Sequence, residues 1–186
     1  KELGPTLDKE IFEEVSENVW VAKSAKISPN AHLGAPLIVD EDAQLGHCAF
    51  IRTSAIIGKG AYVGTASEIK NVILFNGVQV PHYNYVGDSV LGHKAHMGAG
   101  AITSNLKADK SLVTIKDCYD TQEVIETGIK KVGAMLGDFA EIGCNSVLNP
   151  GTVIGRNSNV YPLSPVRGVV PANHIYKNKD EVVAKK

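Results

Sequence analysis

One histidine and two basic residues are the side chains of this sequence that are best suited to chemistry. His82 stands in the polar stretch PHYNY, residues 81–85, and an imidazole can take a proton from an amine or a hydroxyl group. Arg52 and Lys70 lie eighteen positions apart. Placed side by side, a forked guanidinium and an ammonium would bind an anion such as a phosphate. The alternatives are an exposed or structural histidine and two solvated surface charges.

The interval between the two basic residues matters because the chain repeats every six residues. From Val21 to Ile69 every sixth residue is aliphatic, and a small or aliphatic residue stands four places after each. A helix repeats near 3.6 residues and a strand at two, so neither explains this period. Six residues suit one flat side of a β-solenoid, and three sides make a coil. Arg52 and Lys70 are therefore predicted to stack on one side, one coil or about 4.8 Å apart.

A β-sandwich is the alternative fold for this pattern. Its strands would show alternating apolar and polar residues, with turns every 8–12 residues or so. The repeat predicts instead an all-β chain with an N-terminal cap over residues 1–19, a β-helix domain over residues 20–170 and a polar C-terminal tail over residues 171–186. Asp8 is expected to cap a short helix in the first segment, which would cover the open end of the solenoid.

Two interruptions break the six-residue period. Residues 74–85 are dense in aromatic and amide side chains, and residues 103–135 form a longer insertion. Within the insertion, residues 112–116 and 123–127 read as two strands, so a protruding loop or hairpin arm is expected there. Regular coils bracket the whole region, and irregular segments on a rigid scaffold are where function is expected.

Composition narrows the classes of function. The 186 residues carry a formal net charge of −1, so no basic field points to nucleic acid. No apolar run is long enough for a membrane span, and no signal peptide is visible. Cys48, Cys118 and Cys144 form no CxxC pair. A disulfide framework or a metal site is therefore not expected, and a reducing, cytoplasmic location is.

Residues 81–106, PHYNYVGDSVLGHKAHMGAGAITSNL, contain the strings PHxxYxGDSxxG and MGAGxITxNL. This stretch resembles the catalytic region of the glucosamine-1-phosphate N-acetyltransferase domain of bifunctional N-acetylglucosamine-1-phosphate uridylyltransferases, especially the archaeal kind. Those domains are left-handed parallel β-helices of hexapeptide repeats, and they form trimers with active sites between subunits. The resemblance implies a homotrimeric enzyme that transfers an acetyl group from acetyl-CoA to an amino sugar 1-phosphate, in UDP-N-acetylglucosamine biosynthesis.

The same resemblance implies roles for single residues. His82 stands where the family has its general base, and the main chain at Ala99 and the side chain of Asp138 stand where it meets the coenzyme. The family has asparagine at the position of His96, so His96 is assigned to substrate binding and can change which acceptor fits. The other residues that the resemblance assigns to the sugar phosphate are Arg52, Glu68, Lys70, Tyr85 and Asn105.

Three other functions stay open at this stage. A metal hydratase like the γ-class carbonic anhydrases would use His82, His93 and His96, although residues three apart on an extended strand point to opposite faces. A non-catalytic module could hold together a nucleotidyltransferase that lies upstream or on another chain. No GxGxR loop or α/β alternation occurs, so nucleotidyl transfer is not expected from this chain itself. An acyltransferase with a different amino-sugar acceptor is the third.

Overall fold

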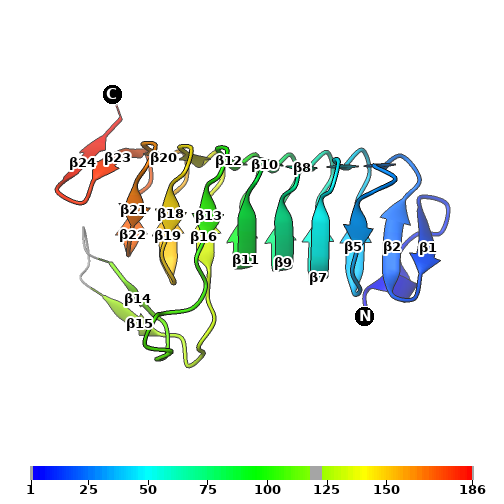
Figure 1. The fold of residues 1–186 in the computed structure, drawn as a ribbon, viewed down its shortest axis with the longest axis horizontal. Coiled ribbons are helices and arrows are strands. Elements are labelled where there is room, and N and C mark those ends of the chain that lie inside the picture. The colour runs from blue at the N-terminus through cyan, green and yellow to red at the C-terminus, as the bar shows by residue number, and fades with distance from the viewer. Residues whose placement is uncertain (1, 118–122, 186) are drawn as a thin grey trace.

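The computed structural model describes residues 2–117 and 123–185. Its strands stack in a row along one long axis, with the two chain ends at opposite ends of the row (Figure 1). Within the coils, neighbouring strands pair in parallel, each with the strand one coil later rather than with the next one in sequence. The parallel β-helix predicted from the six-residue period is confirmed, and the β-sandwich is not found.

The β-helix has three sides, and three long strands bend from one side to the next. The first side is formed by β2 (Val19–Ala22), β5 (Leu37–Val39), the second halves of β7 (Phe50–Ile57), β9 (Glu68–Leu74) and β11 (Tyr85–Leu91), and β16 (Ala134–Leu136), β19 (Thr152–Ile154) and β22 (Val169–Val170). The second side is formed by β3 (Lys26–Ile27), β6 (Gln44–Leu45), β8 (Tyr62–Thr65), β10 (Gln79–His82), β12 (His96–Met97), β17 (Glu141–Ile142), β20 (Asn159–Val160) and β23 (His174–Asn178). The third side is formed by β4 (His32–Leu33), the first halves of β7, β9 and β11, and β13 (Ile102–Thr103), β18 (Val147–Leu148) and β21 (Pro165–Val166).

The repeated aliphatic residues form the core. Val39, Ile57, Val63 and Ile69 have no exposed surface, and the same holds for Ile51. Each fully buried aliphatic side chain stabilises the fold by about 1.5–3 kcal/mol. Because equivalent residues of successive coils pair directly, as Val39 does with Ile57, the core is one continuous column.

The irregular structure predicted for residues 74–85 is wrong. Residues 74–85 continue the β-helix, but the coil there is one residue shorter. Ile57 pairs with Leu74, and Leu74 pairs with Leu91, so these coils contain seventeen residues where earlier coils contain eighteen. The missing residue is absorbed by a register shift between Ile51 and Thr53 in β7. A single-residue shift of this kind changes the sequence period without changing the stack.

The second predicted interruption is confirmed as an arm. β14 (Thr114–Lys116) pairs antiparallel with β15 (Val124–Glu126), and both project away from the stack (Figure 1). A bridge between Leu106 and Lys131 closes the base of the arm. Cys118 lies outside the described residues.

Both ends of the β-helix are covered, in ways that differ from the sequence expectation. At the N-terminal end a short 3₁₀ turn, η1 (Gly4–Thr6), precedes β1 (Phe12–Ser16), which pairs antiparallel with β2, so Asp8 caps no helix. At the C-terminal end β23 forms a hairpin with β24 (Glu181–Ala184), and the Tyr176 side chain is only 2% exposed. Residues 171–185, predicted as a polar tail, therefore include a hairpin that covers this end. In the described part of the chain, no helix has the length and apolar character to cross a membrane.

Candidate functional site

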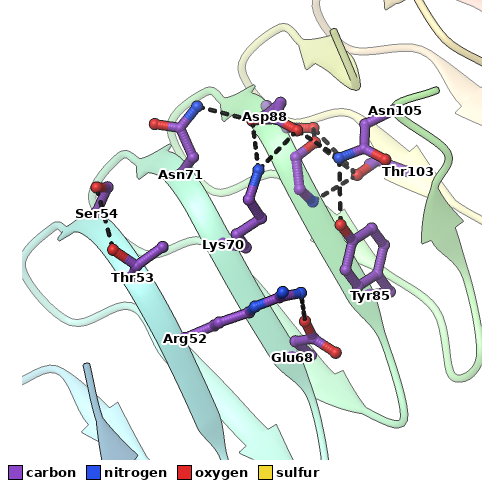
Figure 2. A network of polar contacts seen from close by, with 12 residues as sticks. Arg52, Thr53, Ser54, Glu68, Lys70, Asn71, Tyr85, Asp88, Thr103 and Asn105 are labelled. Carbon is purple, nitrogen blue, oxygen red and sulfur yellow. Dashed lines mark hydrogen bonds and ion pairs between the residues drawn. The ribbon is translucent and has the colours of Figure 1, made fainter. Parts of the chain in front are cut away.

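Five of the six predicted substrate-binding residues gather where β7, β9 and β11 cross the third side and bend toward the first. Glu68 and Tyr85 begin their strands and lie opposite one another in the register. Figure 2 shows Arg52 pointing toward Glu68, and Lys70 pointing toward Asp88 at the bend. Asn105 reaches the same place from the chain that follows β13. Three successive coils and the start of the arm thus contribute to one surface.

The predicted stacking of Arg52 on Lys70 is wrong in its register. The residue opposite Lys70 is Thr53, and Arg52 falls in the register shift. A bulge of this type leaves one residue unpaired and re-aims its side chain. Arg52 donates to Glu68 with 3.4 Å between Nη1 and Oε1, and its side chain stays 56% exposed. An exposed pair of this kind contributes at most about 1 kcal/mol, so the guanidinium is available to another anion.

Lys70 belongs to a tighter cluster around Asp88. Its ammonium lies 3.1 Å from one carboxylate oxygen of Asp88 and 3.2 Å from the other. Asn71 donates from Nδ2 to the Asp88 carboxylate at 2.8 Å, and Asn105 donates to it as well. The side chains of Asp88 and Lys70 are 8% and 20% exposed. The cluster therefore holds Lys70 in one place on the surface.

The protonation of Asp88 follows from these contacts. Burial alone would raise the pKa of the Asp88 carboxyl. Hydrogen bonds from Asn71, Lys70 and Asn105, together with the positive charge of Lys70, outweigh that effect, so the pKa lies below its ordinary value of 3.8. Asp88 is thus an anion at neutral pH, and Lys70 has its counter-ion within the chain.

The left-handed backbone conformation at this bend explains why asparagine and aspartate occur there. Ser54, Asn71 and Asp88 occupy equivalent corners of three coils, and all have positive φ values, of 51°, 52° and 49°. Asparagine and aspartate tolerate this left-handed conformation better than other non-glycine residues. Asp88 was not among the predicted site residues, although it stands inside the PHxxYxGDSxxG string. Its importance depends on partners that only the coil register brings together.

Arg52 and Lys70 each have a partner of opposite charge within the chain. Each cation has its own carboxylate, Glu68 for the first and Asp88 for the second. No anion is needed to hold the two cations on one face. An entering phosphate would first meet the exposed Arg52, with Lys70 behind it.

Tyr85 joins this surface through Asn105, which donates from Nδ2 to the phenolic oxygen at 3.2 Å. The two residues lie on consecutive coils, since Tyr85 pairs with Ile102 at the start of β13. The predicted substrate-binding residues that the fold brings together are Arg52, Glu68, Lys70, Tyr85 and Asn105.

His82 lies one corner away, at the end of β10 on the second side. Its carbonyl oxygen accepts a hydrogen bond from the Gly100 N–H at 3.0 Å. The predicted base therefore lies against the turn that contains Ala99, the predicted coenzyme contact. No hydrogen bond or ion pair joins the exposed imidazole to the cluster around Asp88 among the described residues.

His96 and Asp138 have other neighbours. His96 lies on the second side, and its Nδ1 is 2.8 Å from a carboxylate oxygen of Glu141. Asp138 accepts the His93 N–H at 2.7 Å and so closes a turn between the first and second sides. Neither joins the cluster around Asp88. Within the described ranges, no group of three or more His, Cys, Asp or Glu side chains is arranged to hold a metal ion.

Comparison with known proteins places these features in context. Residues 35–136 match the family model described as the GMPPB C-terminal domain. The chain is 31% identical to the bifunctional protein GlmU of Methanococcus maripaludis. The alignment spans 173 residues, which is 92% of this chain and 41% of that protein. The chain spans less than half the length of this protein and of two further curated GlmU relatives.

Two solved structures show the same fold. A hexapeptide transferase family protein from Anaplasma phagocytophilum has a TM-score of 0.53 and 14% identity, covering 90% of this chain and 80% of that one. AntD, an N-acyltransferase from Bacillus cereus solved with dTDP-4-amino-4,6-dideoxyglucose and coenzyme A, has a TM-score of 0.50 and 18% identity, covering 91% and 81%. At these identities the likeness concerns the β-helix alone.

Proposed function

The chain belongs to the GMPPB C-terminal domain family, and from that premise we propose that it is an acetyl-CoA-dependent N-acetyltransferase acting on an amino sugar 1-phosphate. Glucosamine 1-phosphate is the first candidate acceptor, which would place the product in UDP-N-acetylglucosamine biosynthesis. The observation that carries the proposal is the convergence of two cations, Tyr85 and Asn105 on one surface, one corner from His82. The likeness to bifunctional GlmU proteins supports it.

The phosphate of the acceptor would bind at Arg52, with Lys70 and Tyr85 behind it. A guanidinium that is half exposed and held by one 3.4 Å contact can turn to an anion with little loss. Lys70 keeps its position because Asp88 and the neighbouring amides hold it. Glu68 and Asn105 lie beside the proposed phosphate-binding position, where they would contact the sugar ring.

His82 would accept a proton from the amine of the acceptor while the nitrogen attacks the thioester carbon of acetyl-CoA. The carbonyl oxygen then becomes an oxyanion. The Gly98 N–H is already donated to Ile142 at 2.7 Å, whereas the Ala99 N–H has no acceptor among the described residues. Ala99 is therefore the donor for the oxyanion. When the carbon–sulfur bond breaks, the coenzyme leaves as a thiolate and takes the proton from His82.

The separation of His82 from the phosphate surface within one chain favours a site completed by a second subunit, so we include a homotrimer in the proposal. The first side carries outward aliphatic residues in a groove of about 550 Å³. An exposed apolar stripe of this kind indicates contact with another copy. The stripe is formed by Ile38, Ile56, Ile73, Val90 and Met135.

Release of free coenzyme A thiol from acetyl-CoA tests the proposal. The acceptors to compare are glucosamine 1-phosphate, galactosamine 1-phosphate, glucosamine 6-phosphate and glucosamine. We expect kcat/KM to be highest for a 1-phosphate and at least ~100-fold lower for the sugar without phosphate, because two charge-assisted contacts are lost. Absence of turnover with every amino sugar, in a protein shown to be trimeric, would instead favour the non-catalytic module.

A further inference from the structure

One corner of the β-helix contains an unusual residue. Between the second and third sides, from β7 onward, the residue before each third-side strand is buried, and it is alanine or serine at every position but one. Asn84 stands in this column, although its side chain is 2% exposed and much larger than its neighbours. The column consists of Ala49, Ser67, Asn84, Ala101, Ser146 and Ser164.

Every polar atom of Asn84 is used. Its Nδ2 donates to the carbonyl oxygens of Gly98 and Ala101, at 2.8 and 2.9 Å. Its Oδ1 accepts the His82 N–H at 2.9 Å. Its own N–H donates to Ser67 Oγ at 3.2 Å, and its carbonyl oxygen accepts the Glu68 N–H at 2.9 Å. One buried residue therefore connects three consecutive coils.

The fold does not require an amide at this position. Ser146 occupies the same corner two coils further along the stack, beyond Ala101. Its hydroxyl donates to the Tyr161 carbonyl at 3.0 Å and accepts the Ser164 N–H at 3.2 Å. A serine is thus enough to satisfy the corner. The amide of Asn84 does more, because it reaches both His82, two residues earlier in the same turn, and the turn of the next coil.

We propose that Asn84 is a positioning residue that fixes the distance between His82 and the Ala99 N–H. This inference rests on the proposed function, in which His82 takes the proton and Ala99 binds the oxyanion. Tyr83, between His82 and Asn84, has a positive φ of 52°, a conformation that persists in a tyrosine only when its surroundings enforce it. The hydrogen bond from the His82 N–H to Asn84 Oδ1 spans Tyr83 and holds it in this conformation. The two hydrogen bonds from Asn84 Nδ2 hold the turn that contains Ala99.

Displacement of a catalytic group by about 1 Å can lower a rate about 100-fold. Replacing Asn84 with serine removes the contacts to His82, Gly98 and Ala101, and leaves a residue that the column accepts elsewhere. The side chain of Asn84 makes no hydrogen bond to Arg52 or Lys70 among the described residues, and its contact with Glu68 goes through the main-chain carbonyl, which the substitution keeps. The rate of acetyl transfer should therefore fall, while the affinity for the acceptor should stay the same.

The experiment compares Asn84→Ser with the matched control Ser146→Ala, which loses buried hydrogen bonds in the same column, but to Tyr161 and Ser164 rather than to His82 or the turn that contains Ala99. We expect kcat of Asn84→Ser to fall at least ~30-fold, with KM for glucosamine 1-phosphate within about threefold of the original. The kcat of the control should stay within about twofold of the original value, even if its melting temperature falls further than that of Asn84→Ser. Equal losses of kcat in the two variants, or an unchanged kcat in folded Asn84→Ser, would overturn the positioning role.

A second measurement separates this inference from the proposed function. Amide hydrogen exchange at His82 and Gly100 is expected to become at least ~10-fold faster in Asn84→Ser and to stay unchanged in Ser146→Ala, because local opening controls such exchange. If the unmodified protein acetylates no amino sugar, the proposed function fails, and exchange alone decides the structural claim. Unchanged exchange at both amides in folded Asn84→Ser would refute it.

Discussion

Replacing Asp88 with asparagine tests the cluster that holds Lys70. The change keeps the shape of the side chain and removes its charge. Two contacts from the Lys70 ammonium, at 3.1 and 3.2 Å, lose their anionic partner, and two amide donors compete for one remaining oxygen. A hydrogen bond to a charged group is worth about 1.5–3 kcal/mol, so we expect the free energy of unfolding to fall by about 2–4 kcal/mol near neutral pH.

The same variant has a characteristic pH dependence. Because the folded-state pKa of Asp88 lies below 3.8, the folded state binds the Asp88 proton more weakly than the unfolded state does. The carboxylate therefore stabilises the fold fully above that ordinary value, and the contribution disappears as the pH falls through the lower folded-state pKa. The difference between the original protein and Asp88→Asn should be constant from about pH 7 to pH 5 and should shrink below about pH 4.

Urea unfolding followed by circular dichroism at several pH values measures this difference. Glu41→Gln is the matched control, because Glu41 pairs with Lys59 at 3.4 Å on the exposed surface, and loss of that pair should change the free energy by less than about 1 kcal/mol. An Asp88→Asn variant as stable as Glu41→Gln would refute the reasoning. A difference that grows on acidification would refute the assigned direction of the pKa shift.

Three further predictions concern the proposed site and assembly. Arg52→Ala should raise KM for glucosamine 1-phosphate at least ~10-fold with little change in kcat, since the phosphate contact is the same in the ground and transition states; steady-state kinetics measures this. His96→Asn should change the ratio of kcat/KM between glucosamine 1-phosphate and galactosamine 1-phosphate by at least ~5-fold, while leaving the melting temperature nearly constant because the contact with Glu141 is exposed. Val90→Asp places a charge in the apolar groove and should convert the proposed trimer to monomers in sedimentation experiments; a variant with the same oligomeric state as the original protein would exclude this face from the interface.

The sequence predicts the architecture well because its signal is repeated. Each coil needs an inward aliphatic residue on every side, so residues such as Val39 and Ile57 recur at a fixed interval. The arm could also be predicted, since two β-prone segments stand inside a long insertion. Tyr176 shows the limit of this reasoning. It is buried by a hairpin within a segment whose polar composition indicates a tail.

The candidate site could be predicted only in part. The residue types for binding a phosphate are visible in the sequence, and the fold brings most of them together. Their pairing depends on register, and one shifted residue in β7 places Thr53, rather than Arg52, opposite Lys70. Asp88 and Asn84 were missed for the same reason, because their partners lie on other coils at intervals that the period alone does not give.

Thiol release by His82→Ala, with saturating acetyl-CoA and glucosamine 1-phosphate, tests the assigned base most directly. His82 is exposed, and its hydrogen bonds in the described part of the chain go through the main chain, so the variant should fold and keep its KM. Its kcat should fall at least ~100-fold, the usual effect of removing a general base. A rate equal to that of the original protein would contradict acetyl transfer at this corner of the β-helix.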